Sequence, residues 1–288
     1  MISVEKLSLF NIETFRKLYN KNKNSYIYNQ NFFEIYDNES FIAKYIIRKQ
    51  VKLFKFEKMF VGYVWYERPS EDELTNIYSI YVQEEYIQYI DSNILKLLNS
   101  NHFRLDIIDS FTINNIMDKL QFSATSQTML MKIKSENCKM NMEFSDYAIR
   151  HFIKKQDEKL RCKIQNSVFN DKDRVPLSIG DIFAEEEDEY YIDDFGVFIC
   201  NSDGIEVGYG QIIYNKGQYT IVNLGILEEY RGLGYGEKLV RYLINFCNKK
   251  NITDVHIRVE KKNHKAISLY YKIGFREYNS LTTWSKFR

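Results

Sequence analysis

The sequence predicts an α/β fold in two similar domains, and three observations carry this prediction. Short motifs recur at a nearly constant spacing along the 288 residues. Apolar residues alternate in some segments, as in strands, and recur every three or four positions in others, as in helices. The second half has the order strand, helix, strand, which is typical of a crossover unit in a mixed sheet. A chain of this length is also long enough for two ordinary domains.

Internal similarity marks the two domains. KMFVGYVWY at 58–66 resembles GIEVGYGQI at 204–212, and their Gly-Tyr pairs are 146 positions apart. MDKLQF resembles YYKIGF, and their last residues, Phe122 and Phe275, are 153 positions apart. The second repeat is therefore longer between these two points, in an interval that contains a glycine-rich loop.

The polar stretch SENCKMNME separates the two repeats. It predicts a first domain at 1–136, a linker at 137–143 and a second domain at 144–288. Each repeat is expected to contain a helical region, a strand, a strand ending in the Gly-Tyr pair, a third strand, a helix, a strand and a helix. In the second half the expected strands are DFGVFICN, EVGYGQIIY, YTIVNLGI and 254–260, with helices at 236–248 and 265–273.

Composition excludes several classes of function. Hydrophobic residues make up 44% and charged residues 27%, as in globular proteins. Forty basic and thirty-nine acidic residues give a formal charge of +1, which argues against nucleic acid or membrane as a partner. No apolar stretch is long enough to span a bilayer, and the start lacks a signal pattern. Four widely spaced cysteines indicate a cytoplasmic protein, and four histidines without ligand spacing predict no metal.

The stretch EEYRGLGYGEKLV at 228–240 places Gly232, Gly234 and Gly236 directly before a predicted helix. A helix N-terminus that follows a strand presents free N–H groups, which bind anions. Alternating glycines would let a phosphate reach these groups without a Cβ clash. The alternative is a tight turn that needs left-handed residues, for which one or two glycines suffice. The spacing matches neither the Rossmann nor the P-loop motif.

Arg231-Gly232-Leu233-Gly234-Tyr235-Gly236 resembles the [RQ]-x-x-G-x-[GA] motif of the GNAT superfamily of acetyl-CoA-dependent N-acetyltransferases. Asn263-x-x-Ala266-x-x-Leu269-Tyr270-x-x-x-Gly274-Phe275 is similar to the second signature of that family. The close resemblance covers about 208–275. It implies two tandem GNAT-like domains, each with a mixed, twisted, mostly antiparallel sheet flanked by helices.

The resemblance also implies roles for individual residues. Tyr270 would be the catalytic general acid that protonates the departing thiolate. The remaining residues would bind acetyl-CoA: backbone of Leu224 and Ile226 along the pantetheine arm, amides of Arg231, Gly232, Leu233, Gly234, Tyr235 and Gly236 at the pyrophosphate, and Asn263, which would also cap the last helix.

Two points stay open. Tyr270 shares an apolar helix face with Ala266 and Ile273, so it could be a core residue with a satisfied hydroxyl. The general base is undetermined: Glu260 and His256 share one strand face, and either could also be an ordinary surface residue. The acidic run EEEDEYYIDD at 185–194 is either a wall that attracts a cationic amine or a solvated loop.

The first repeat lacks the chemistry. Its loop position reads VQEEYIQYIDSN, without glycine, and Glu84 and Glu85 would repel a pyrophosphate. Under the offset of 153, Tyr270 corresponds to Met117 and Gly274 to Gln121. This half therefore resembles the degenerate member of a tandem pair.

These observations predict an acetyl-CoA-dependent N-acetyltransferase that acts on a primary amine, with a small molecule as the preferred acceptor. The alternative is a non-catalytic acyl-CoA-binding module that regulates a partner. Both hypotheses need the glycine loop, but only the enzyme needs Tyr270. A homodimer is possible if a strand edge is left exposed.

Overall fold

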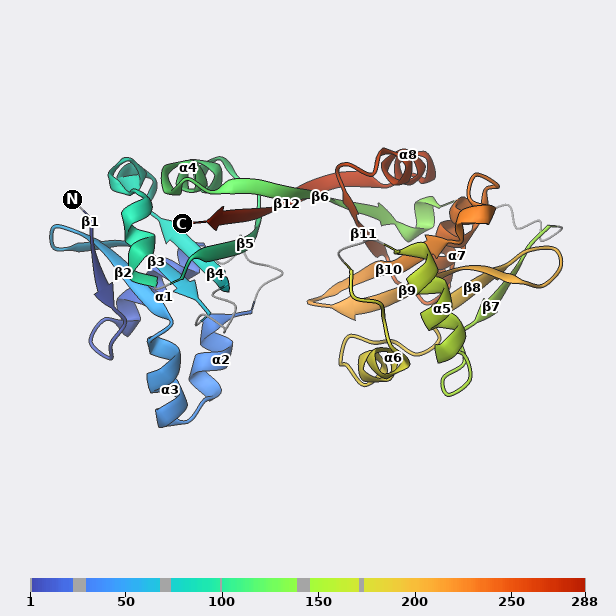
Figure 1. Cartoon of the computed structure of the whole chain (residues 1–288), viewed down its shortest axis with the longest axis horizontal. Coiled ribbons are helices and arrows are strands. Elements are labelled where there is room, and N and C mark those ends of the chain that lie inside the picture. The colour runs from blue at the N-terminus through green and yellow to red at the C-terminus, as the bar shows by residue number, and fades with distance from the viewer. Residues whose placement is uncertain are drawn as a thin grey trace. The chain divides into compact units, whose positions relative to one another are not determined.

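A computed structural model describes residues 2–22, 30–67, 74–98, 100–138, 146–170 and 174–287 (Figure 1). The chain divides into two compact units, an N-terminal unit of Met1–Thr128 with Asn279–Arg288 and a C-terminal unit of Met129–Tyr278. Each unit is a mixed sheet with helices, as the α/β prediction requires.

The division into units differs from the sequence-based boundaries. Residues 129–136 were expected in the first domain but belong to the C-terminal unit, and Asn279–Arg288 was expected in the second but belongs to the N-terminal unit. Of the expected linker at 137–143, residues 139–143 lie outside the described residues. Strand pairing with distant segments decides the assignment, and no local pattern reports it.

The N-terminal unit contains a sheet in the order β1-β2-β3-β4-β5-β12-β6. Pairing is antiparallel in β1–β2, β2–β3, β3–β4 and β5–β12 and parallel between β4 and β5. Side chains of successive residues alternate between two cores, so that Leu53 joins the core under α1 and α2 while Phe54 joins the core under α4. The bounds are β1 Ile2–Lys6, α1 Ile12–Lys21, α2 Phe32–Asn38, α3 Phe41–Arg48, β2 Val51–Phe56, β3 Met59–Tyr66, β4 Leu74–Val82, η2 Glu84–Tyr89, η3 Ser92–Leu98, β5 His102–Ile108, α4 Phe111–Leu120 and β6 Ser123–Lys134.

One expected helix of the N-terminal unit is not α-helical. The segment after β4 forms the two 3₁₀ segments η2 and η3 instead. Glu84 and Glu85 occupy the first turn of η2. The strand β1 at the start of the unit was not predicted, because its five residues mix polar and apolar types without a long alternation.

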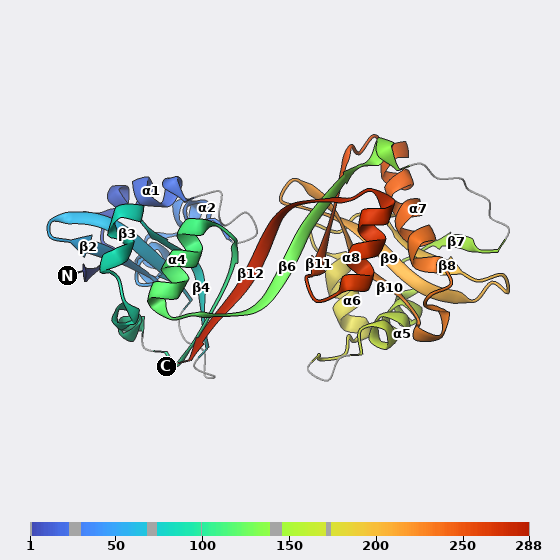
Figure 2. The ribbon, with the colours of Figure 1, turned by 90° about the horizontal axis from the view of Figure 1, so that it is seen from above.

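The C-terminal unit contains a sheet in the order β6-β11-β10-β9-β8-β7. Only β10 and β11 pair in parallel among the pairs β7–β8, β8–β9, β9–β10 and β10–β11. Helices α7 and α8 cover one face of this sheet, and α5 and α6 cover the other (Figure 2). The bounds are η4 Ser135–Asn137, β7 Ala148–His151, α5 Glu158–Val168, α6 Ile179–Glu186, β8 Gly196–Cys200, β9 Glu206–Asn215, β10 Gln218–Ile226, η5 Glu228–Tyr230, α7 Tyr235–Lys249, β11 Asp254–Glu260, α8 His264–Ile273 and β12 Arg276–Phe287.

Two long strands pass from one unit to the other. The second part of β6 contributes Met131 and Ile133 to the core of the C-terminal unit. The last part of β12 pairs with β5, Leu281–Phe287 against His102–Ile108, and its Trp284 packs on the core of the N-terminal unit. Each unit therefore receives a strand from the half of the sequence that builds the other.

The structure confirms the internal repeat. The glycines of the Gly-Tyr pairs lie at equivalent positions inside β3 and β9, because Gly62 is opposite Val82 and Gly208 is opposite Ile226, the last residues of β4 and β10. The sequence had predicted that each pair ends its strand, and this is wrong, because β3 and β9 both continue beyond the pair. Gln121 and Gly274 both end a helix in the left-handed conformation, with φ of 60° and 119°.

The described helices offer no candidate for crossing a membrane, since none combines sufficient length with sufficient hydrophobicity.

Candidate functional site

The C-terminal unit has a cavity where β10 and β11 separate. Within the described residues the two strands pair at three positions, Tyr219–Ile221 with Val255–Ile257. A cavity of about 960 Å³ opens beside them. Its lining comes from the end of α5, the segment after it, both strands and α8, and consists of Val168, Phe169, Asn170, Arg174, Ile221, Val222, Asn223, Leu224, Ile257, Arg258, Val259, Glu260, Lys262, Asn263 and Tyr270.

A bulge in β10 shapes this cavity. The register between β9 and β10 shifts between Val222 and Gly225, and Asn223 adopts a left-handed φ of 54°. Asparagine tolerates this conformation better than most residues. The bulge lies where β10 leaves β11, so that Val222 and Leu224 line the cavity instead of pairing with β11, while Val222 still pairs with Gln211 of β9.

The glycine loop leads from β10 into α7. Gly232 and Gly234 have φ of 81° and 85°, and an added Cβ would meet nothing within 4 Å at either position. These two glycines are therefore required by backbone conformation, as the turn hypothesis proposed. Gly236 differs, because it lies in the first turn of α7 with no positive φ, and an added Cβ would make only ordinary contacts. The conformation of the turn therefore does not explain the glycine at position 236.

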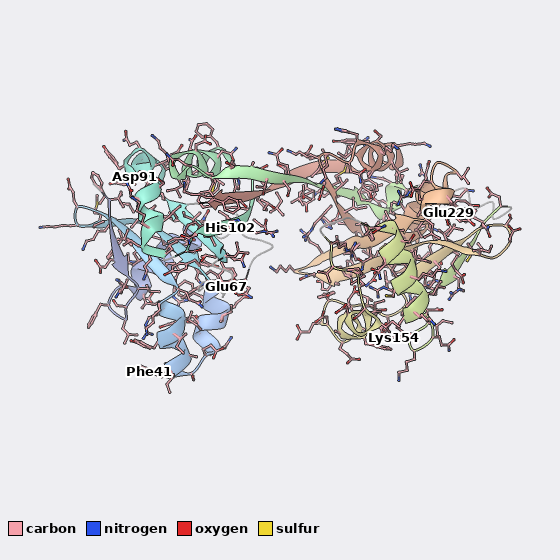
Figure 3. The ribbon with its side chains drawn as sticks, viewed as in Figure 1. Phe41, Glu67, Asp91, His102, Lys154 and Glu229 are labelled. Carbon is pink, nitrogen blue, oxygen red and sulfur yellow. The ribbon has the colours of Figure 1, made fainter. Side chains whose placement is uncertain are left out.

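The amides at this turn have no partners in the described part of the protein. Gly234 caps α7 without a side-chain hydrogen bond. Within the described residues, no hydrogen bond is donated by the backbone N–H groups of 232–237. Glu229, labelled in Figure 3, lies in the 3₁₀ turn that precedes them. Free N–H groups at the N-terminus of a fifteen-residue helix form a site for an anion.

Arg231 does not take the position that the resemblance implied. Its amide donates to the carbonyl of Glu228, so it is not available to a pyrophosphate. Its guanidinium donates to two carbonyls, at 2.9 Å to Ile226 and 3.3 Å to Val168. Arg231 thus ties the end of β10 to α5, and the amides without a partner among the described residues are those that follow it.

Asn263 caps α8, as predicted. Its Oδ1 accepts from the amide of Ala266 at 3.1 Å, and the residue also lines the cavity. Two helical turns further on, Tyr270 reaches the same cavity and is 7% exposed.

The hydroxyl of Tyr270 is the feature that separates the two interpretations of this residue. No hydrogen bond to it occurs within the described residues, whereas a buried core tyrosine normally finds a partner. Burial raises the pKa of Tyr270 to about 12. The side chain is therefore a protonated hydroxyl that faces a cavity, as a general acid would be.

The two candidate bases are placed differently. Glu260 lines the cavity, where it forms an exposed ion pair with Lys262 at 2.8 Å. His256 lies earlier on β11, edge-on to Tyr278, and is not part of the lining. Burial lowers the pKa of His256. Of the two, only Glu260 shares the cavity with Tyr270.

Sequence reasoning missed a buried polar network behind the cavity. Arg161 of α5 is fully buried and forms an ion pair with Glu185 of α6. The second oxygen of Glu185 accepts from Gln211 at 3.1 Å and from the cavity-lining Asn223 at 3.3 Å. Glu185 opens the acidic run at 185–194, so this carboxylate belongs to the interior rather than to a solvated loop. The only signal in the sequence was that run itself.

The equivalent positions in the N-terminal unit carry no such site. Met117, which corresponds to Tyr270, is completely buried in the core. The glycine loop is replaced by η2 with its two glutamates. Among the described residues of the whole chain, no group of three or more histidine, cysteine or acidic side chains could hold a metal ion.

Comparison with known proteins agrees with this geometry. Residues 167–275 match the acetyltransferase (GNAT) family. The C-terminal unit contains a GNAT-family domain. The match includes the bulge of β10, the glycine loop and Tyr270, and it ends at Phe275, just after α8.

Relatives of the GNAT domain are N-acetyltransferases by name. N-alpha-acetyltransferase 50 of Danio rerio is 37% identical over 62 residues, which are 21% of this chain and 37% of that protein. The probable N-acetyltransferase san of Drosophila melanogaster is 32% identical over 123 residues, 42% of this chain and 61% of that protein. The chain thus spans less than two thirds of either relative.

Solved structures show the fold of the entire chain. A GCN5-related N-acetyltransferase from Sphaerobacter thermophilus has a TM-score of 0.66 at 14% identity and covers 99% of this chain and 95% of its own. A tandem GNAT protein from the clavulanic acid biosynthesis pathway has a TM-score of 0.57 at 9% identity, and the alignment covers 100% of this chain and 98% of that one. The tandem arrangement of two GNAT-like units therefore has counterparts among solved structures.

Proposed function

We propose that the protein transfers an acetyl group from acetyl-CoA to a primary amine at the cavity of the C-terminal unit. The observation that carries this proposal is the Tyr270 hydroxyl, which lines the cavity beside the separated strands β10 and β11 and has no hydrogen-bond partner among the described residues. Free amides at the N-terminus of α7, the helix that follows β10, support it. Bound acetyl-CoA would supply a thioester as the acetyl donor.

The residues present suit that donor. The amides of 232–237 would bind the diphosphate, because they are free and lie at the positive end of α7. The edge of β10 that does not pair with β11 would hydrogen-bond the amide groups of the pantetheine arm in the manner of a strand, at Leu224, as the sequence predicted, and at Val222. Ile226, the other residue expected there, does not line the cavity, and its carbonyl accepts from Arg231. Asn263, the N-cap of α8, lines the same cavity.

Two groups of the chain would transfer protons, and a third would orient the amine. As the amine nitrogen bonds to the thioester carbon and the carbon–sulfur bond breaks, Tyr270 would give its proton to the leaving sulfur. Glu260, which lines the cavity, would accept the amine's proton directly or through water. Asn223 is held by Glu185 through its amide nitrogen, which leaves its carbonyl oxygen to orient the amine.

The acceptor proposed is an amine on a small molecule. The lining carries the cations Arg174, Arg258 and Lys262 against one carboxylate, Glu260, so a polycationic amine is disfavoured and an acceptor with its own acidic group is favoured. A protein N-terminus is the second candidate, because relatives matched by the domain are named N-alpha-acetyltransferases.

The test measures thiol release from acetyl-CoA against small amines, amino acids and short peptides, together with calorimetry for coenzyme A. We expect binding of coenzyme A and turnover with one class of amine. Binding without turnover for any amine would favour a non-catalytic acyl-CoA-binding module, and absence of binding would refute both functions.

Changing Gly234 to alanine should weaken coenzyme A binding by about tenfold. An L-residue at φ of 85° costs roughly 1–2 kcal/mol, which the loop relieves by turning its amides away. Gly217 is a matched control, since it has φ of 78°, open space where a Cβ would be added and a position in the β9–β10 hairpin. Calorimetry should show weaker binding for Gly234→Ala and unchanged binding for Gly217→Ala. Equal affinity in both variants would contradict the assignment of the loop.

A further inference from the structure

The N-terminal unit has a pocket of its own. It measures about 420 Å³ and lies between the end of β1, the C-terminal end of α3 and the start of β2. Figure 3 labels Phe41 at the beginning of α3, and the pocket is at the other end of that helix. The residues that line it are Lys6, Leu7, Ser8, Leu9, Tyr45, Arg48, Lys49 and Lys52.

Four of these residues are cations, and none of the described lining residues is acidic. Lys6 and Lys52 stand directly opposite each other in the antiparallel register of β1 and β2. Like charges at such positions destabilise a sheet. Burial, and then the charge of Lys6, lower the pKa of Lys52. The two strands thus keep a repulsive pair that a neutral residue at either position would remove.

Arg48 adds a buried charge to this pair. It is 6% exposed, and its one hydrogen bond among the described residues goes to a neutral group, the Tyr36 hydroxyl, at 2.7 Å. A buried guanidinium is normally paired with a carboxylate. Glu5, the acid next to Lys6 on β1, instead binds Asn11 and Lys55.

The remaining lining residues supply apolar contacts. Leu9 and Tyr45 are 58% and 53% exposed, and the Lys49 ammonium lies 4.3 Å from the centre of the Tyr45 ring. A cavity of this size is within the range of small-molecule sites. Cations around a half-apolar rim suit an anion that carries an organic group.

We propose that this pocket binds a small organic phosphomonoester. The doubly charged phosphate would lie among Arg48, Lys49 and the Lys6–Lys52 pair, and the organic group would contact Leu9 and Tyr45. A singly charged carboxylate would leave most of these cations uncompensated, which favours phosphate. The site is separate from the acetyl-transfer proposal, because every lining residue belongs to the N-terminal unit.

Calorimetry on the full chain with phenyl phosphate, inorganic phosphate and benzoate, at constant ionic strength, tests the proposal. We expect phenyl phosphate to bind most tightly, inorganic phosphate more weakly and benzoate weakest, with affinities that fall as salt rises. No binding of phenyl phosphate, or equal binding of benzoate, would overturn it. Association with vesicles containing phosphatidic acid but no binding of soluble phenyl phosphate would also overturn it, since the site would then be a lipid surface.

The variant Lys52→Met gives two opposite signals. Phenyl phosphate should bind at least about tenfold more weakly, as expected for the loss of one charge-assisted contact. The ligand-free N-terminal unit should melt at a higher temperature, because the repulsion with Lys6 is gone. Thermal unfolding followed by tryptophan fluorescence reports this unit, since Trp65 and Trp284 both belong to it.

Lys55→Met is the matched control on the same strand. Lys55 pairs with Glu5 at 3.2 Å and does not line the pocket. Its substitution should leave affinity for phenyl phosphate unchanged and should not raise the melting temperature. If Lys52→Met retains full affinity, or if both variants lose it equally, the pocket is not the binding site.

Discussion

Replacing Tyr270 with phenylalanine should lower kcat by about 10²- to 10⁴-fold while leaving the affinity for coenzyme A unchanged. The hydroxyl has no partner among the described residues, so its removal breaks no hydrogen bond there. The variant should therefore be as stable as the parent protein, or slightly more stable. Thiol-release kinetics and calorimetry measure the two quantities separately.

The raised pKa of Tyr270 predicts the pH dependence of the reaction. Burial disfavours the phenolate, so with a pKa of about 12 the side chain keeps its proton throughout neutral and mildly alkaline pH. The rate should not fall between about pH 8 and pH 10 through loss of this proton. The same burial would raise the pKa of a coenzyme A thiol formed beside Tyr270. The pKa of the proton donor, Tyr270, and that of the acceptor, the thiolate, would therefore lie closer together.

Tyr271→Phe is the control for this experiment. Tyr271 is the next residue of α8, is 40% exposed, and directs its hydroxyl to the sulfur of Met129 at 3.8 Å. Its substitution should leave kcat within a few-fold of the parent value. Equal losses in the two variants, or none in Tyr270→Phe, would show that Tyr270 is a core residue.

Changing Glu185 to glutamine should destabilise the C-terminal unit by about 3 kcal/mol. The change leaves the guanidinium of Arg161, which is completely buried, without its ion-pair partner. Removing one member of a buried pair typically costs about 3–5 kcal/mol, and the retained carbonyl of glutamine places this case at the lower end. Activity should fall as well, since Asn223 loses the carboxylate that holds it.

The chain provides a separate probe for each unit. All four cysteines lie in the C-terminal unit, three of them buried, and both tryptophans lie in the N-terminal unit. In Glu185→Gln, the cysteine thiols should become reactive at a lower urea concentration than in the parent protein. The urea midpoint of the tryptophan fluorescence transition should stay unchanged. Glu187→Gln, at an exposed position just after α6, should change neither. A shift of less than about 1 kcal/mol in Glu185→Gln would mean that the pair is not stabilising.

Much of the C-terminal unit could be predicted because its signals are local. The alternation of Val255, Ile257 and Val259 defines β11, and the glycines fix the turn into α7. The N-cap role of Asn263 was implied by the second family signature, which is also a local motif, and the structure confirms it. Backbone conformation and burial periodicity are both encoded within a few residues.

The features that could not be predicted depend on distant pairs. Glu185 and Arg161 are 24 positions apart and meet only when α5 and α6 pack together. Arg231 carries the right motif, but its guanidinium is recruited by the carbonyl of Val168, which no motif specifies. The like-charged pair of Lys6 and Lys52 appears only once the register of β1 and β2 is known.

The crossing of β6 and β12 has a consequence for any attempt to divide the protein. Cleavage within 137–143 would yield two fragments, each without one strand segment of its own sheet. The first fragment would lack Asn279–Arg288 of β12, and the second would lack the part of β6 that starts at Met129. Each fragment alone should fold poorly and aggregate, because its sheet would expose an unpaired strand edge. When the two fragments are mixed, each should supply the strand segment that the other lacks, so the pair should fold together by fragment complementation.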